Sequence, residues 1–163
     1  MGAIEDIVLD RGVRTRISAL RSLLPENFVE DAAKFILLDN PAHAFILTGF
    51  YIPTPYQFPL PESGSVETDG PPGSYFLGQA LRKLGWKVTY VTDHFGTFAF
   101  QGMPGGENII EFPITDPETS EQYAKDLLAR HNPSVVIAIE RVGATAKGRY
   151  LNIRGWDITE RTA

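Results

Sequence analysis

The pattern of apolar and polar positions predicts helices at the start of the chain and alternating strands and helices after them. An apolar stripe with i, i+3, i+4 spacing indicates a helix over residues 27–38, and residues 12–24 form another helical stretch before it. The continuous apolar run Ala44–Leu47 is typical of a strand that is buried on both faces. A helix over residues 74–84 and a β-branched, aromatic strand over Lys87–Val91 come next.

The remaining stretches differ in character. Residues 51–66 contain four prolines among aromatic residues and show no usable period, so we expect a long irregular loop, a kind of segment that is often functional. Residues 94–108 are rich in glycine, and Asn108–Phe112 predicts a short strand. Thr115–Glu118 combines a helix cap with a first-turn proline, and Val135–Ile139 is the most strand-like run of the chain.

This order of elements predicts the fold class. Strand, helix, strand, helix and strand in succession indicate parallel βαβ units with right-handed crossovers. We therefore expect an α/β, Rossmann-like, mainly parallel sheet flanked by helices over residues 44–163, preceded by a helical N-terminal extension over residues 1–43. A strand at the edge of this sheet would have unpaired backbone groups. Residues 149–158 are apolar enough to cover it as a further strand or to drive self-association into a homo-oligomer.

Composition and charge exclude several classes of function. Of the 163 residues 43% are hydrophobic, and a net charge of −5 without any basic run makes nucleic acid and anionic membranes poor partners. The absence of cysteine excludes disulfides, thiolate metal sites and a cysteine nucleophile, and three scattered histidines do not suggest a zinc site. No targeting segment or membrane-spanning run is recognisable, so we expect a cytoplasmic protein, with the mitochondrial matrix as the weaker alternative.

The segment Glu67–Gly73 has the most unusual composition in the chain. It holds two carboxylates, a hydroxyl, two glycines and two prolines just before a predicted helix, with Gly70 as the expected N-cap and Pro71 as the first helical residue. The prolines remove two of the N–H donors that make helix N-termini good anion sites, and the carboxylates repel phosphate. The segment therefore suits an ammonium group, a metal cation or acid/base chemistry. A capped polar surface loop is the alternative.

Polar residues also follow the predicted strands. Ligands of open α/β sheets bind outside the carboxyl ends of the strands, so these residues and the Glu67–Gly73 segment should meet around one cleft. Arg141 or Arg154 can hold a substrate carboxylate in a two-pronged hydrogen bond, and a solvated surface charge is the alternative for each. The glycines never show G-x-G-x-x-G spacing, so a nicotinamide cofactor is unsupported. The residues at the strand ends are Thr48, Gly49, Thr92, Asp93, Glu140 and Arg141.

Five short motifs occur in order along the chain. They are Thr48-Gly49-Phe50, Glu67–Gly73, Val91-Thr92-Asp93, Glu140-Arg141-x-Gly143 and Tyr150-x-Asn152-x-Arg154-Gly155-x-Asp157-Ile158. Together they resemble the D-glutamate cyclase-like C-terminal domain family, over about residues 44–159. The resemblance implies a Rossmann-like α/β fold and the conversion of D-glutamate to 5-oxo-D-proline and water. Family members continue after this region through further α/β units, so the chain looks like the front portion of such a domain.

The resemblance and the strand-end positions together suggest how such a site would work. Cyclisation needs a base for the ammonium, an acid for the departing hydroxyl and a clamp for the α-carboxylate, and two carboxylates in unlike environments can serve as acid and base. The suggested catalytic residues are Glu67, Asp69, Asp93 and Glu140. The suggested substrate-binding residues are Thr48, Gly49, Thr68, Gly70, Gly73, Arg141, Asn152 and Arg154.

Two other functions stay open at this point. A relative without turnover would keep the fold and the pocket edge as a module that binds a small ligand or a partner. Alternatively, Asp69, Asp93 and Glu140 would bind Mg²⁺ or Mn²⁺ through oxygen ligands in a metal-dependent hydrolase. No cofactor is firmly implied, with a divalent cation as the alternative, and the expected partner is a small amino acid such as D-glutamate.

Overall fold

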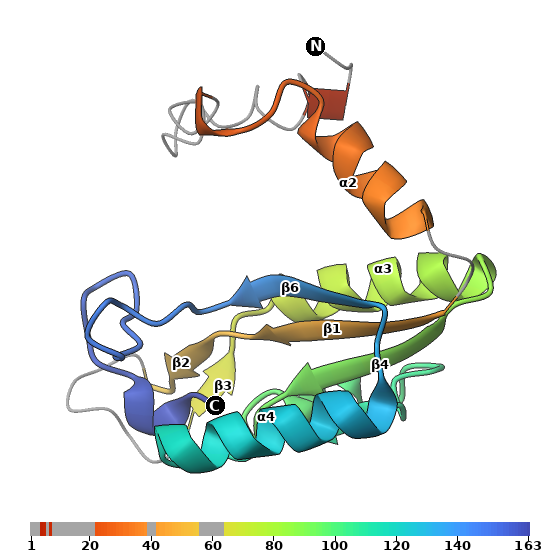
Figure 1. Ribbon diagram of the computed structural model, residues 1–163. Helices are drawn as coiled ribbons and strands as arrows, with labels where there is room; N and C mark the ends of the chain where they lie inside the picture. Colours follow the sequence, from red (N-terminus) through yellow and green to blue (C-terminus); the bar gives the residue numbers. More distant parts are fainter. Residues whose placement is uncertain (1–3, 6, 8–21, 39–41, 56–63) are drawn as a thin grey trace. The chain divides into compact units, whose positions relative to one another are not determined.

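The computed structural model describes residues 4, 5, 7, 22–38, 42–55 and 64–163, and the chain forms two compact units, Met1–Asn40 and Pro41–Ala163 (Figure 1). In the first unit, helix α2 spans Phe28–Leu37 and carries two acidic residues in its first turn, where they oppose the positive end of the helix dipole. Glu30 and Lys34 form an i,i+4 ion pair of 2.6 Å on its surface. The predicted helix over residues 12–24 lies mostly outside the described residues.

The second unit is built on a four-stranded sheet in which all neighbouring strands are parallel. The strands β1 (His43–Gly49) and β4 (Lys87–Thr92) form its centre, with β5 (Ile109–Glu111) beside β4 and β6 (Val135–Arg141) beside β1. Strand β1 is buried along almost its whole length, as its continuous apolar run predicts. The predicted α/β, Rossmann-like fold is confirmed.

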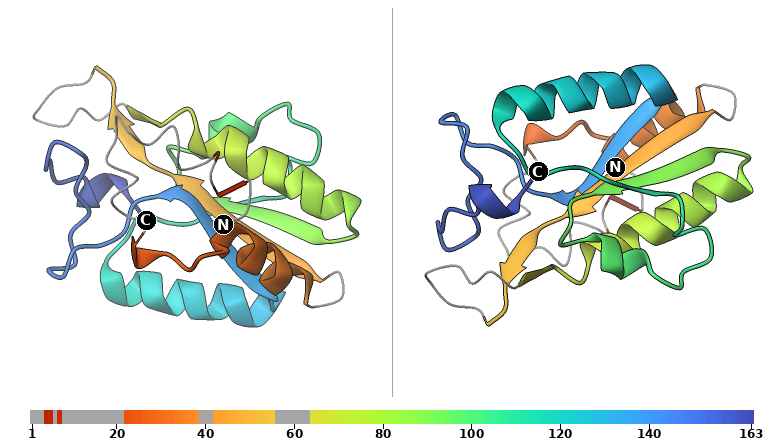
Figure 2. Two further views of the ribbon diagram at one scale, coloured as in Figure 1. Left: turned by 90° about the horizontal axis from the view of Figure 1, so that it is seen from above. Right: turned by 90° about the horizontal axis from the view of Figure 1, so that it is seen from below.

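Two helices cover this sheet from opposite sides. Helix α3 (Gly70–Lys83) packs on one face and α4 (Pro117–His131) on the other, and the strands lie between them in both views of Figure 2. On the α4 side, Phe45, Val91 and Leu127 form a buried apolar cluster. Because the central strands β1 and β4 are buried on both faces, their ends are the places where a ligand can reach them.

Both covering helices begin at an aspartate. The Asp116 carboxylate accepts a hydrogen bond from the Thr119 N–H at 2.9 Å, so α4 starts where the Thr115–Glu118 pattern predicts. At α3 the cap is Asp69 and the first helical residue is Gly70, so the expected Gly70 cap is wrong by one residue. The physical reason is that the Asp69 carboxylate accepts the Gly70 N–H at 3.2 Å, which a glycine side chain cannot do.

The segment expected to be an irregular loop, residues 51–66, contains two short strands, and its residues 56–63 lie outside the described residues. Strand β2 (Tyr51–Pro53) pairs antiparallel with β3 (Gly64–Val66), so the expectation of a wholly irregular loop is wrong there. Strands of three residues are too short to show a period in the sequence. The Glu67 N–H donates to the Phe50 carbonyl at 2.9 Å, and this pairing returns the chain to the end of β1 just before α3 begins.

Residues 149–158 fold back on themselves instead of joining the sheet. Leu151 and Asp157 form a single antiparallel bridge, and the Ile158 N–H donates to the Tyr150 carbonyl at 2.9 Å. The expected further strand beside β6 is therefore wrong, and in the described part of the chain β6 has a neighbour on one side only. The side chain of Ile158 is fully buried, whereas that of Ile153 is 95% exposed, so only part of the apolar surface of this turn is packed.

The second unit also contains two short 3₁₀ helices: η3 (Thr97–Phe100) follows β4, and η4 (Thr159–Arg161) follows the turn at residues 149–158. Among the described residues, none of the helices has the length and apolar character needed to cross a membrane.

Candidate functional site

The topology of the sheet marks one position where a ligand is expected. From β1 the chain moves through α3 to β4 and then to β5, whereas after α4 it returns to the other side of β1 as β6. The strand order therefore reverses between β1 and β6, and open α/β sheets bind ligands outside the carboxyl ends of the strands at such a reversal. The residues at these two strand ends are Thr48, Gly49, Glu140 and Arg141.

A β-bulge at the end of β6 reverses which side of the sheet its last two side chains face. Leu47 pairs with Ala138 and Gly49 with Arg141, so two residues of β6 lie opposite Thr48 alone. Glu140 is the second of these two and has a φ of +49°, in the left-handed region that non-glycine residues seldom adopt. The bulge turns Glu140 toward the first turn of α3, while Arg141 lines a cavity on the α4 side.

Three carboxylates meet on the α3 side of this strand end, and we call them the acidic cluster: Glu67, Asp69 and Glu140. One carboxylate oxygen from each lies within 4.8 Å of those of the other two. Glu67 is half-buried and the other two side chains are exposed. Burial raises the pKa of the Glu67 carboxyl, and the negative charges of Asp69 and Glu140 raise this pKa further.

The first turn of α3 has no N–H group left for an anion. The Gly70 N–H donates to the Asp69 carboxylate, and the Gly73 N–H donates to the Asp69 carbonyl at 3.1 Å. Pro71 and Pro72, which stand between them, have no N–H. A helix N-terminus normally attracts anions through these groups, so this one favours a positively charged ligand, as the sequence suggested.

Gly70 allows the acidic cluster and the end of β1 to approach each other. A Cβ atom at this position would lie 2.6 Å from the Glu140 Cβ and 2.8 Å from the Thr48 Oγ1. Any side chain larger than hydrogen would therefore displace one of these neighbours. The Thr48 side chain is fully buried, and its hydroxyl oxygen has no hydrogen-bond partner in the structure.

A cavity of about 400 Å³ adjoins Glu67 and is also lined by Asn152. The Asn152 Oδ1 accepts hydrogen bonds from the N–H groups of Arg154 at 2.9 Å and Trp156 at 3.0 Å. Its Nδ2 is buried and has no hydrogen-bond partner. The turn at residues 149–158 thus holds the oxygen end of this amide, while its buried nitrogen is left without a partner. The other lining residues are Phe50, Tyr51, Ile52 and Ile153.

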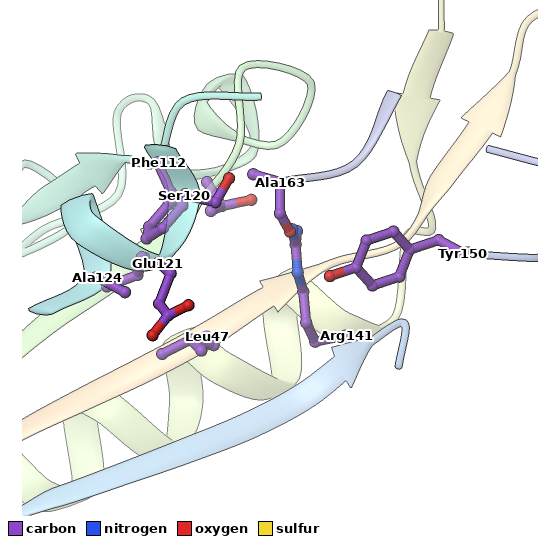
Figure 3. A pocket seen from close by; sticks show the side chains of 10 residues that line it. Leu47, Phe112, Ser120, Glu121, Ala124, Arg141, Tyr150 and Ala163 are labelled. Carbon is purple, nitrogen blue, oxygen red and sulfur yellow. The ribbon is translucent and has the colours of Figure 1, made fainter. Parts of the chain in front are cut away.

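The α4 side of the same strand end carries an ion pair. An Arg141 N–H donates to the Asp93 carboxylate at 2.8 Å, and the Asp93 side chain is only 2% exposed. The guanidinium also donates to the Gly49 carbonyl at 3.1 Å and to the Ala163 carbonyl. Figure 3 shows it beside Tyr150 in a cavity of about 320 Å³. Asp93 therefore has a fixed cationic partner, whereas none of the ion pairs between described residues includes a carboxylate of the acidic cluster.

The residues suggested from the sequence fall into three groups in the structure. The acidic cluster lies with Thr48, Gly70 and Gly73 on the α3 side, and the exposed Thr68 stands within the same segment. Asp93, Gly49 and Arg141 are joined on the α4 side. Asn152 shares a cavity with Glu67, while the Arg154 guanidinium lies 5.6 Å above the Trp156 ring.

Sequence reasoning missed the cavity walls Phe50–Ile52, which follow directly after the strand end at Gly49. The aromatic pair Phe50 and Tyr51, directly after a strand end, is a sequence signal that could have indicated this cavity wall. It also missed the bulge, because nothing in the β-branched pattern of β6 distinguishes Ile139 from Glu140 as the extra residue.

Comparison with known proteins bears directly on this site. The family model described as D-glutamate cyclase-like, C-terminal, matches residues 4–163, so the chain belongs to this family and the predicted resemblance is confirmed. The match covers nearly the whole chain, including residues before the motifs that indicated it. A search of curated proteins finds no significant match.

Proposed function

We propose that this member of the D-glutamate cyclase-like family converts D-glutamate to 5-oxo-D-proline and water at the acidic cluster and the cavity beside it. The observation that carries the proposal is that one cavity is lined by both Glu67 and Asn152. Glu67 offers a negative group for an ammonium, and a small movement that exposes the buried, unpaired Asn152 Nδ2 would offer a donor for a carboxylate. Ammonium and carboxylate are the two ends of an amino acid.

The acidic cluster recognises the ammonium group in this proposal. Three carboxylates lie together, and no N–H group of the first turn of α3 remains to attract an anion. A cation in this position gains from all three charges, whereas a carboxylate or phosphate is repelled. The preference for a D-amino acid rests on the family membership, because the cluster itself is not selective for chirality.

The Asn152 amide binds a carboxylate oxygen of the substrate. Its Nδ2 is buried without a partner, and a hydrogen bond to an ionised group would satisfy it. A cavity of about 400 Å³ falls in the range of small-molecule sites, which extends from about 300 to 1,000 Å³. The apolar wall at Phe50 and Ile52 would lie against the methylene groups of glutamate.

The reaction joins the amine nitrogen to the γ-carboxyl carbon. The ammonium first loses a proton to a carboxylate of the cluster, and the neutral nitrogen attacks the γ-carboxyl carbon. The nitrogen then loses a second proton as the C–N bond is completed and one C–O bond breaks. The departing oxygen leaves as water after it receives protons, and Glu67, Asp69 and Glu140 are the groups placed to transfer them. Asp93 and Arg141 act at a distance in this proposal: their ion pair holds the bulge and so positions Glu140.

The proposal is tested by incubating the chain with D-glutamate and with L-glutamate and following 5-oxoproline by NMR. We expect conversion of D-glutamate and little conversion of the L-isomer. Asn152→Asp keeps the Oδ1 acceptor and removes the Nδ2 donor, so it should raise KM about tenfold, the effect of about 1.4 kcal/mol. A folded chain that binds D-glutamate without converting it would contradict the cyclase and support the binding module instead.

A further inference from the structure

We infer that the cavity on the α4 side of the strand ends is a second small-molecule site, and that it takes a small monocarboxylate with an apolar body. Its volume of about 320 Å³ falls within the range of small-molecule sites, which extends from about 300 to 1,000 Å³. None of the described residues lines both this cavity and the one at Glu67, so the two are separate sites.

The apolar wall of this cavity is continuous with the core under α4. Leu47, Val91 and Phe112 line the cavity, and they also belong to the group of apolar side chains that packs around Phe45 and Leu127. Leu47 and Phe112 are only half-buried beside the cavity. A hydrocarbon group in this place removes their remaining apolar surface from water, so the wall favours a ligand with an apolar body.

The same cavity supplies hydrogen-bond donors for an anionic head group. Figure 3 shows the Tyr150 hydroxyl directed toward the Arg141 guanidinium. A guanidinium has five N–H donors, and the hydrogen bonds to Gly49, Asp93 and Ala163 use three of them. Among the described residues, neither the other two donors nor the Tyr150 hydroxyl has a hydrogen-bond partner. A carboxylate accepts charge-assisted hydrogen bonds from such groups, which are stronger than neutral ones.

The charges around the cavity select one carboxylate rather than two. Arg141 is paired with Asp93 at 2.8 Å, and Glu121, which lines the cavity, is paired with Lys125 at 2.6 Å. These four charges cancel, so a single carboxylate gains from the guanidinium without meeting a net negative wall. A second carboxylate would lose its hydration against the apolar wall. An amine in place of the carboxylate would lose the hydrogen bonds from Arg141, because a guanidinium has no acceptor.

The probe for this site is 4-methylpentanoate, which combines one carboxylate with a branched hydrocarbon body. Titration of the full chain is followed by NMR at the methyl groups of Leu47 and Val91, which report on this cavity directly. We expect saturable shifts with a Kd on the order of 10⁻³ M, as for a small ligand with one charged head group. The amine 4-methylpentan-1-amine keeps the body and should cause no saturable shift. D-Glutamate should bind here at least about tenfold more weakly.

Three variants test the walls of the site. Ala124→Leu adds bulk to the side of α4 that lines the cavity, and it should abolish the titration shifts. Ala129→Leu is the matched control, because it makes the same change at an exposed position of the same helix that does not line the cavity. Arg141→Lys keeps a positive charge for Asp93 but loses the planar fork, so it should weaken binding at least about tenfold. Tyr150→Phe should weaken it about threefold.

The inference is overturned by the absence of saturable shifts up to about 50 mM, or by shifts that Ala124→Leu leaves intact. Loss of binding in Ala129→Leu as well would show that Ala124→Leu acts through the helix and not through the cavity. Equal binding of the amine, or an unchanged Kd in both Arg141→Lys and Tyr150→Phe, overturns the carboxylate as the head group. If Arg141→Lys does not fold, the amine and Tyr150→Phe decide this point. D-Glutamate that binds as tightly as 4-methylpentanoate at the same methyl groups overturns the apolar acid.

Discussion

The two sides of the β1 and β6 strand ends handle charge in opposite ways. On the α4 side, Asp93 and Arg141 neutralise each other at 2.8 Å, and backbone carbonyls take further hydrogen bonds from the guanidinium. On the α3 side, the acidic cluster holds three like charges together without a described cationic partner. On the paired side each buried charge is compensated, so the loss of one partner is costly, while the like-charged side costs stability and is typical of a functional site.

The bulge in β6 determines that Glu140 faces the α3 side and Arg141 the α4 side. In a regular strand, the alternation of side chains would place Glu140 on the face of Ala138 and Arg141 on the face of Ile139. The extra residue reverses this assignment from Glu140 onward. Two clusters of opposite character therefore depend on one local irregularity, and the following predictions test each side separately, from the largest effect to the smallest.

Removing the cation of the paired side should have the largest effect on stability. Arg141→Met would leave the Asp93 carboxylate buried without a counter-charge, which costs about 3–5 kcal/mol of unfolding free energy for a buried pair. Urea denaturation followed by circular dichroism measures this loss. The double variant Asp93→Asn, Arg141→Met should recover part of it, because no uncompensated charge remains. A loss below about 1 kcal/mol in the single variant would show that the pair behaves as an exposed one.

Crowding the α3 side of the strand ends should lower the unfolding free energy by a smaller amount. Gly70→Ala places a Cβ 2.6 Å from the Glu140 Cβ and 2.8 Å from the Thr48 Oγ1, so the helix or the bulge must move, at a cost of about 1–3 kcal/mol. Gly73→Ala is the matched control one turn later, since its nearest neighbour, the Ile139 Cγ2, is 3.7 Å away. Chemical denaturation of both variants should show a loss at Gly70 only. Equal effects would mean that Gly70 is not the point of close approach.

The elements that carry this comparison were only partly predictable from the sequence. The strands that end at Gly49, Thr92 and Arg141 follow from local apolar runs, and their convergence at one edge follows from the parallel topology. The composition of the Glu67–Gly73 segment, with two carboxylates and two prolines, is enough by itself to indicate an acidic site. For these reasons the fold and the acidic character of the site could be expected before any coordinates.

The sequence does not show which face of the sheet Glu140 and Arg141 occupy. It depends on the β6 bulge, which reflects pairing with β1 and leaves no local mark in the sequence. The Asp93 and Arg141 partners are 48 residues apart, and such a contact depends on tertiary packing. The cavity at Asn152 likewise forms only when the turn at residues 149–158 folds back beside β2.

A third test separates acid effects on the site from acid effects on the fold. Burial lowers the pKa of His43, at the opposite end of β1, where its ring nitrogens contact the Thr89 hydroxyl at 2.8 Å and the His131 carbonyl at 3.1 Å. The unfolded chain therefore binds a proton more readily than the folded one just below pH 6.5. Stability should be complete above that pH and fall as the pH decreases toward the lowered pKa, by at most about 1.4 kcal/mol per pH unit.

Urea midpoints between pH 5 and pH 8 measure this slope, and His43→Gln is the variant that should flatten it. If the slope persists in His43→Gln, another group is responsible, and acid inactivation of the site could not be separated from acid destabilisation of the fold.

The smallest effect is expected where one of the like charges is removed. Glu140→Gln relieves the repulsion with Glu67 and Asp69, so the unfolding free energy should rise slightly, by about 0.2–0.5 kcal/mol, as for other exposed like-charge pairs. The same variant should lose conversion of D-glutamate, so stability and activity would change in opposite directions. Raising the salt concentration should shrink the stability gain, because exposed charges are screened. Glu107→Gln, which removes a charge far from the cluster, should change neither quantity. A loss of stability in Glu140→Gln would mean that this carboxylate has a stabilising partner after all, and the contrast between the two sides of the strand end would no longer hold.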